Sequence, residues 1–131
     1  MSDALELAAG DWRATLLPRQ GAAMARLTWR GRDILAPLPA GADPNATPAG
    51  AFLMAPWANR LDQGRLPVGS AVHHVPVNRP ADATAIHGLL RDRAWRVEQA
   101  GRDAATLAAV LDAPAQPFRL AARPQVALDA A

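Results

Sequence analysis

Short apolar runs, separated every few residues by proline or glycine, make up most of the chain. Helices need longer uninterrupted windows, whereas strands joined by tight turns suit this spacing. The pattern therefore predicts an all-β fold. Strands are expected at residues 11–16, 23–29, 33–35, 52–54, 66–68, 72–77, 95–98, 106–111, 118–120 and 125–128.

Glycine-containing turns join neighbouring strands in this prediction. Turns at Gly31, at Gly69 and at Gly101 each lie between two apolar segments, as hairpins require. The alanines of residues 106–111 favour a helix by propensity, although pairing through the Gly101 turn favours a strand. Residues 36–50 are rich in proline, alanine and glycine, and they predict a long loop.

Composition limits the size of the hydrophobic core. Alanine supplies 32 of the 66 apolar residues, and it adds little core volume. Leu, Ile, Val and Phe together number 27 of 131 residues, which is close to the lower limit for a chain that folds. The length fits one domain over residues 1–131, and its thin core indicates that a partner or further chain completes it.

The charge pattern argues against nucleic-acid binding. All 14 basic residues are arginine, and they exceed the acidic residues by only two. The sequence pI of about 10.9 is high because the chain has no Lys, Tyr or Cys, so little titrates between neutrality and the Arg pKa. The arginines are spread along the chain without forming a basic stripe, so we expect no nucleic-acid partner.

Several features indicate a cytoplasmic protein without disulfides. The chain has no cysteine, which excludes a disulfide framework and thiolate zinc sites. It begins with an acidic segment containing Asp3 and Glu6, where a signal peptide needs basic residues. Its longest uncharged stretch, residues 44–59, contains three prolines and is too short to span a bilayer. We therefore expect no membrane association.

The adjacent histidines His73 and His74 do not predict a metal site. They lie in a predicted strand, where neighbouring side chains point to opposite faces. No cysteine supports them, and no acidic residue lies nearby in the sequence. We interpret both as strand residues and predict no bound metal.

Two other stretches combine residues suited to a polyhydroxylated ring. Trp57, Asn59 and Arg60 place an aromatic face, an amide and a guanidinium fork in one loop. His87 precedes Gly88, so an imidazole lies beside a residue that permits close backbone approach. Each stretch also has a purely structural interpretation. Arg60 could pair with Asp62 at the surface, and His87 could cap a turn.

An ordered set of motifs resembles the aldose 1-epimerase (galactose mutarotase) family. The set comprises residues 31–35, 56–61 with 64–66, Asn78, 86–89 and Trp95, and the resemblance runs from about residue 25 to residue 120. No single motif is specific, but their order and spacing are similar to those of the family. Leucine after His87-Gly88 resembles the bacterial mutarotase-related branch and leaves the particular sugar open.

The resemblance implies a fold, a reaction and a site. The fold would be the N-terminal part of a galactose mutarotase-like β-supersandwich. The activity would interconvert the α and β anomers of a free aldohexose by acid–base ring opening, without metal or cofactor. Asn59 and Arg60 resemble the sugar-contacting pair of the family, and His87 resembles its first active-site histidine.

The family's second histidine and glutamate base have no counterpart here. The only glutamates are Glu6 and Glu98, and neither fits the position of the base. We therefore expect the chain to be the N-terminal portion of a mutarotase and to be inactive alone. The alternative is a non-catalytic or vestigial carbohydrate-binding module. A supersandwich interrupted in mid-sheet leaves exposed strand edges, which predict self-association.

Overall fold

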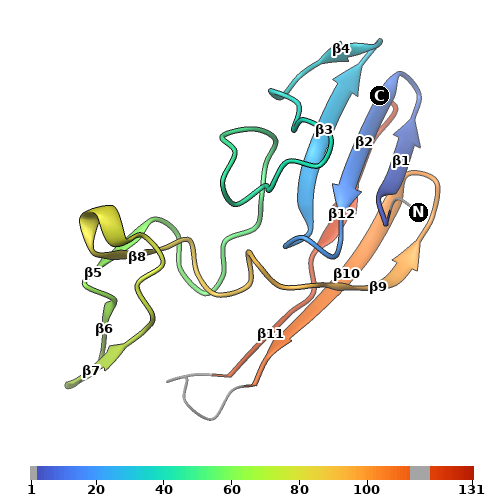
Figure 1. Ribbon diagram of the computed structural model, residues 1–131. Helices are drawn as coiled ribbons and strands as arrows, with labels where there is room; N and C mark the ends of the chain where they lie inside the picture. The colour runs from blue at the N-terminus through green and yellow to red at the C-terminus, as the bar shows by residue number, and fades with distance from the viewer. Residues whose placement is uncertain (1–2, 113–118) are drawn as a thin grey trace.

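The computed structural model describes residues 3–112 and 119–131, and these residues form strands and loops without an α-helix (Figure 1). The predicted all-β class is therefore confirmed. The elements are β1 (Leu5–Ala9), β2 (Trp12–Leu17), β3 (Ala23–Trp29), β4 (Arg32–Asp33), β5 (Arg60–Asp62), β6 (Arg65–Val68), β7 (Ala71–His74), a short 3-10 helix η1 (Pro80–Asp82), β8 (Thr84–Ile86), β9 (Arg96–Ala100), β10 (Ala104–Leu111), β11 (Leu120–Ala122) and β12 (Gln125–Ala127).

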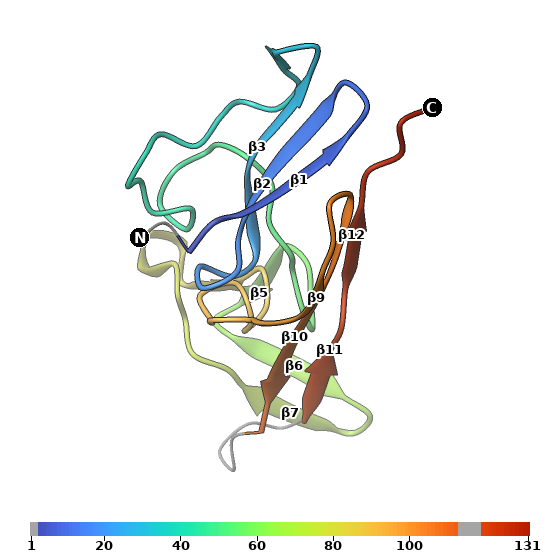
Figure 2. The same ribbon diagram turned by 90° about the vertical axis from the view of Figure 1, so that its right-hand side faces the viewer.

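Two antiparallel sheets form the body of the molecule. The first has the strand order β1-β2-β3-β4, and the second is built around β10. Strand β9 pairs with one edge of β10, while β12 and β11 pair with successive parts of β10 on the other side. Figure 2 shows the two sheets as separate layers. A hydrogen bond from the Ala8 amide to the Arg102 carbonyl (2.7 Å) links them at one end.

The hydrophobic core lies between these two sheets. The first sheet contributes Leu7 and Leu16, and β10 contributes Leu107 and Leu111; all four are about 1% exposed or less. Trp95 enters the same cluster from the segment before β9. Burying these side chains removes apolar surface from water, which is the main force holding the sheets together.

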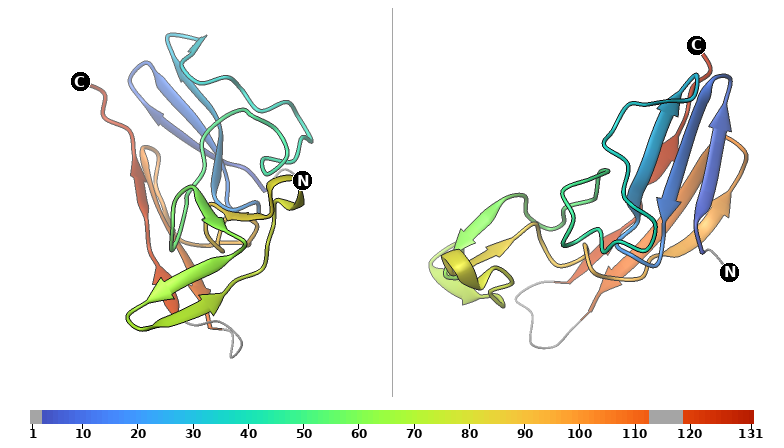
Figure 3. Two further views of the ribbon diagram at one scale, coloured as in Figure 1. Left: turned by 90° about the vertical axis from the view of Figure 1, so that its left-hand side faces the viewer. Right: turned by 45° about the horizontal axis from the view of Figure 1, so that its top comes forward.

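Two small sheets extend from the body as an arm. One pairs β5 with β8, and the other pairs β6 with β7. Figure 3 shows the arm projecting from the two larger sheets. It has little core of its own, because only Val75 and Ala85 are buried apolar residues within β5–β8. The arm and the segments that join it to the body carry the candidate site.

Several predicted strands and turns are confirmed. The strand at 23–29 matches β3, and its hairpin with β4 turns at Arg30-Gly31. The hairpin at Gly69-Ser70 joins β6 to β7. The alanine-containing segment 106–111 belongs to β10, where pairing with strands on both sides outweighs helix propensity.

Other predictions need correction. Residues 52–54 are not a strand; this segment crosses from a bridge between Ala51 and Met24 to a bridge between Ala55 and Gly88. The strand expected over 72–77 ends at His74. Strands β1, β5 and β8 were not predicted. Strands β5 and β8 are only three residues long, which is too short for an alternating pattern to show, whereas β1 has five residues. The expected strand at 118–120 begins outside the described residues; of the part described, only Leu120 is in a strand, as the first residue of β11.

The core position of β10 makes a stability prediction. We expect Leu107→Ala to lower the free energy of unfolding by about 2–5 kcal/mol, because it removes a fully buried side chain. Val110→Ala is the matched control on the same strand, where the side chain is 65% exposed. It should change stability by less than about 0.5 kcal/mol. Urea unfolding measures both variants, and equal losses would contradict this placement of the core.

Candidate functional site at the ends of β5 and β8

Pairing of β5 with β8 brings the predicted site residues together. Arg60 lies opposite Ile86, and one residue further the His87 amide donates to the Asn59 carbonyl (2.9 Å). Asn59 and His87 both have left-handed backbones, with φ of 62° and 64°. This conformation ends the strand pair at the same level on both sides. The short strands thus place Asn59, Arg60 and His87 at neighbouring backbone positions.

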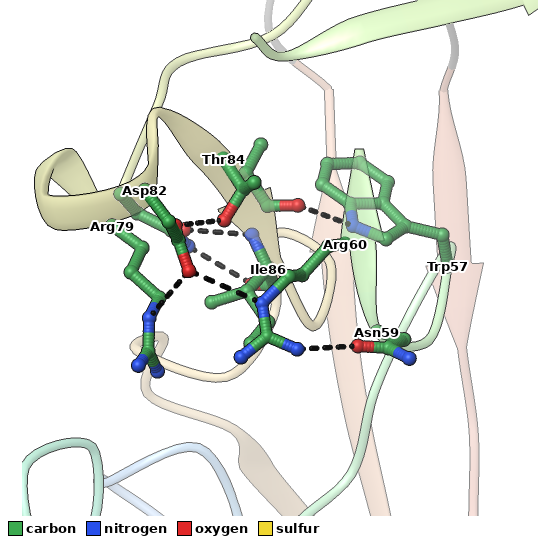
Figure 4. Close-up of polar contacts among 9 residues, drawn as sticks. Trp57, Asn59, Arg60, Arg79, Asp82, Thr84 and Ile86 are labelled. Carbon is green, nitrogen blue, oxygen red and sulfur yellow. Dashed lines mark hydrogen bonds and ion pairs between the residues drawn. The ribbon is translucent and has the colours of Figure 1, made fainter. Parts of the chain in front are cut away.

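The other polar groups of these motifs hold β8 in place. The Asn78 side chain accepts from the Ile86 amide (2.7 Å) and donates to the Ile86 carbonyl (3.0 Å), as a paired strand would. The Trp57 indole donates to the Ala85 carbonyl at 3.3 Å (Figure 4). Asn78 and Trp57 therefore hold the backbone of the two residues before His87 in place, so their role is to position His87.

Gly88 permits a close approach of two backbone segments. It forms a parallel bridge with Ala55, and the Leu89 amide donates to the Ala55 carbonyl (2.7 Å). Gly88 has φ of 78°, and a Cβ at this position would overlap the Ala55 backbone. The expectation that glycine here allows close backbone contact agrees with this geometry.

A single carboxylate contacts two arginines of the arm. Asp82 contacts Arg60 Nε (3.3 Å) and Arg79 Nε (3.0 Å), and it accepts a hydrogen bond from Thr84 Oγ1 (2.6 Å; Figure 4). Arg60 also donates to Asn59 Oδ1 (3.1 Å). The Thr84 hydrogen bond and the two arginine charges lower the pKa of Asp82, although burial opposes them.

Arg60 therefore has a different partner from the nearby carboxylate suggested by the sequence. The alternative pairing was with Asp62, two residues away on the same strand. The observed partner, Asp82, comes from the η1 turn 22 residues later. This contact fixes the direction of the Arg60 guanidinium from a second element.

A cavity of about 960 Å³ lies beside this strand pair. Residues 45–50 form one wall, and residues 86–89 and 91–93 form the other, with Asn78 and Arg79 at one side. His87 lines the cavity, and its ring lies 5.2 Å from the Phe52 ring between centroids. Asn59 and Arg60 are not among the lining residues. The structure thus joins the three residues through β5 and β8 but places only His87 on the cavity wall.

The surroundings of His87 favour its neutral form. Burial lowers the pKa of His87, and the positive charges of Arg91, Arg60 and Arg79 lower it further. The ring nitrogen Nδ1 is buried and has no hydrogen-bond partner among the described residues. Placing the proton of the neutral ring on Nε2 avoids burying an N–H donor without an acceptor. Nε2–H is then the group that can donate to a ligand.

The glutamates lie elsewhere in the molecule. Glu6 on β1 accepts a hydrogen bond from Thr15 on β2 (2.9 Å). Glu98 on β9 lies between Arg123 and Arg96, and the hydrogen bond from Arg123 is the main cause that lowers the pKa of Glu98. Neither glutamate lines the cavity.

Sequence reasoning missed several residues of the cavity wall. They include Phe52, Arg79, Arg91, Asp92 and Arg93, none of which stands out in the sequence pattern. Their positions follow from long-range contacts that local spacing does not reveal.

Neither histidine of β7 belongs to this site. His73 and His74 occupy successive positions of the strand and do not line the cavity. Within residues 3–112 and 119–131, no group of three or more His, Cys, Asp or Glu residues could hold a metal ion. The same residues contain no helix long and apolar enough to cross a membrane.

Comparison with known proteins identifies the family. The family described as aldose 1-epimerase matches residues 3–131. The chain belongs to the aldose 1-epimerase family. The resemblance seen in the ordered motifs is thereby confirmed.

Similar proteins in this family are considerably longer. The uncharacterized protein YihR of Escherichia coli (strain K12) is 32% identical over 129 residues, which cover 96% of this chain and 40% of YihR. A putative aldose 1-epimerase from Escherichia coli K12 has a TM-score of 0.82 at 18% identity, covering 97% of this chain and 42% of that chain. A GalM/aldose epimerase homologue from C. elegans has a TM-score of 0.79 at 20% identity, covering 98% and 42%. The shared galactose mutarotase-like fold is confirmed.

The contact at Gly88 in this aldose 1-epimerase family member makes a second prediction. Gly88→Ala should lower the free energy of unfolding by about 1–2 kcal/mol for the left-handed backbone. Overlap with Ala55 should add a further ~1–3 kcal/mol. Gly69→Ala is the matched control, because Gly69 also has positive φ but has open space around it. Chemical denaturation compares them, and equal losses would contradict the close approach at Gly88.

Titration of His87 makes a third prediction. Its pKa should lie below the ordinary value of about 6.5. Because the unfolded chain binds this proton more readily, stability should fall as pH drops from the ordinary histidine range towards the folded pKa. ¹⁵N-detected NMR should show the Nε2–H tautomer at neutral pH, and His87→Gln assigns the signals. An Nδ1–H tautomer or a raised pKa would contradict this description.

Proposed function

We propose that the chain forms part of the sugar site of an aldose 1-epimerase, with an aldohexose held in the cavity against His87. The position of His87 carries the proposal: it ends β8, lies on the cavity wall and is joined to Asn59 across the strand pair. Family membership supplies the reaction class. Asn59 and Arg60, beside this wall, contact the part of the sugar that extends past His87.

The reaction moves two protons and breaks one ring bond. A base removes the proton of the anomeric hydroxyl, the bond between C1 and the ring oxygen breaks, and an acid protonates the ring oxygen. Rotation about the C1–C2 bond and reversal of these steps give the other anomer. Each positioned acid or base typically contributes about 10²–10⁴-fold.

His87 has the properties needed for one of these steps. A neutral imidazole with its proton on Nε2 donates a hydrogen bond to the ring oxygen and stabilises the charge that develops there. Burial and three neighbouring arginines maintain this neutral form.

The second candidate function is sugar binding without catalysis. It is favoured by the positions of Glu6 and Glu98, both of which bind other side chains outside the cavity. In this case the chain recognises an aldose through the same wall but transfers no proton from the anomeric hydroxyl. Both functions require the same sugar ligand, but only the first accelerates its mutarotation.

A combined binding and rate experiment tests the proposal. Addition of D-galactose or D-glucose should shift the His87 imidazole signals saturably, and His87→Gln should weaken binding about tenfold, equivalent to one lost hydrogen bond of ~1.4 kcal/mol. His74→Gln is the matched control, since His74 lies on β7 away from the cavity. Absence of saturable binding would contradict the proposed site.

Polarimetry of fresh α-D-galactose then separates the two functions. We expect the 131-residue chain to accelerate mutarotation little beyond buffer. A rate proportional to protein concentration and lost in His87→Gln would establish catalysis by this chain. Binding without such a rate would support the binding function for the chain alone.

A further inference from the structure

Arg91 stacks on Phe52, and Phe52 in turn contacts the ring of His87. Its guanidinium carbon lies 3.9 Å from the centre of the Phe52 ring. Phe52 in turn lies 5.2 Å from the His87 ring, with an angle of 58° between the two planes. The three side chains come from two segments, the crossing at residues 51–55 and the chain after β8. The orientation of His87 is therefore linked to Arg91 through the ring between them.

The same guanidinium reaches the opposite wall of the cavity. Arg91 Nη2 donates to the carbonyls of Pro44 and Asn45, both at 3.2 Å. Among the hydrogen bonds of the described residues, these two join residues 43–50 to the wall that carries His87. The ends of the loop are attached to β3 instead, through Leu38 and Ala51. Arg91 thus holds the middle of the loop.

A purely packing role does not explain this choice of residue. An apolar side chain could cover Phe52 without the cost of burying a charge. Burial lowers the pKa of Arg91, and its Nε has no hydrogen-bond partner among the described residues. Asp43 partly offsets this through its charge. A planar fork that stacks on a ring and also bonds two carbonyls is specific to arginine.

We propose that Arg91 is a positioning residue of the cavity, which sets the plane of the His87 imidazole through Phe52 and holds residues 43–50 as the facing wall. This role rests on the proposed function, because it matters for chemistry only if His87 meets the sugar. Arg91 itself acts through Phe52 and the loop, so it is not a catalytic residue.

The charges around His87 give this role a measurable signature. Arg91, Arg60 and Arg79 all act on the imidazole, and each lowers the pKa of His87. Removal of Arg91 takes away one positive charge and admits water to the ring. Both effects favour the charged imidazole, so the pKa of His87 should rise. Arg91→Lys keeps the charge but loses the planar fork, so it separates the electrostatic effect from the geometric one.

The experiment uses the 131-residue chain labelled with ¹⁵N and compares Arg91→Gln with Arg91→Lys. Arg91→Gln should raise the pKa of His87, whereas Arg91→Lys should change it less. Both should increase amide hydrogen exchange of residues 45–50 about tenfold, as expected for losing the paired hydrogen bonds. Both should also weaken galactose binding. Arg93→Gln is the matched control, because it removes a cavity arginine that does not stack on Phe52.

Two outcomes would overturn the proposal. One is an Arg91→Gln variant whose His87 pKa and loop exchange equal those of the wild type. The other is an Arg93→Gln variant with the same changes as Arg91→Gln. If galactose does not bind the wild type, the proposed function fails, while the comparison of pKa and exchange still decides the role of Arg91.

A second variant keeps the test decisive if Arg91→Gln does not fold. Phe52→Leu removes the ring between Arg91 and His87 but keeps the two carbonyl bonds of Arg91. It should alter the imidazole chemical shifts of His87 and leave exchange of residues 45–50 unchanged. Unaltered imidazole shifts in this variant would contradict the link through Phe52.

Discussion

Burial of Leu90 between the two large sheets determines where the candidate site lies. Leu90 is fully buried, and its carbonyl accepts the indole hydrogen of Trp95 at 3.0 Å. The amides of Gly21 and Trp95 then tie residues 93–95 to the turn between β2 and β3. This anchored segment begins three residues after His87, so the position of the imidazole is set by the core and not by the small arm alone. The cavity occurs where the body and the arm meet.

The arginines near the cavity have two kinds of environment. Arg60 and Arg79 share the single carboxylate of Asp82 within the arm, which offsets part of their charge. Arg91 bonds backbone carbonyls and an aromatic face, so its charge is less fully compensated. Burial and the charges of these three arginines lower the pKa of His87, which favours the neutral imidazole. The described part of the chain therefore supplies orientation and polarity at the cavity.

Local pattern predicted most of the longer strands and several of the tight turns, but not β1 or its turn into β2. Strand β3 and the hairpins at Gly31 and Gly69 follow from alternation and glycine placement. The pattern wrongly predicted a strand at residues 52–54. A short apolar run has the same sequence pattern whether it pairs along its whole length or forms bridges only at its ends. It missed β5 and β8, whose pairing joins segments more than twenty residues apart. Such short strands pair only when the fold of the segment between them brings them together.

The sequence by itself indicated the all-β class, the family resemblance and the candidate residues Asn59, Arg60 and His87, because alternation, turn chemistry and the order of motifs can all be read along the chain. The tertiary structure decided what these residues contact. It gave Arg60 the distant partner Asp82, and it placed His87 alone of the three on the cavity wall. It also brought Phe52 against the imidazole and Arg91 against Phe52. These contacts depend on how the two sheets bury Leu90, and spacing along a single chain carries no information about that packing.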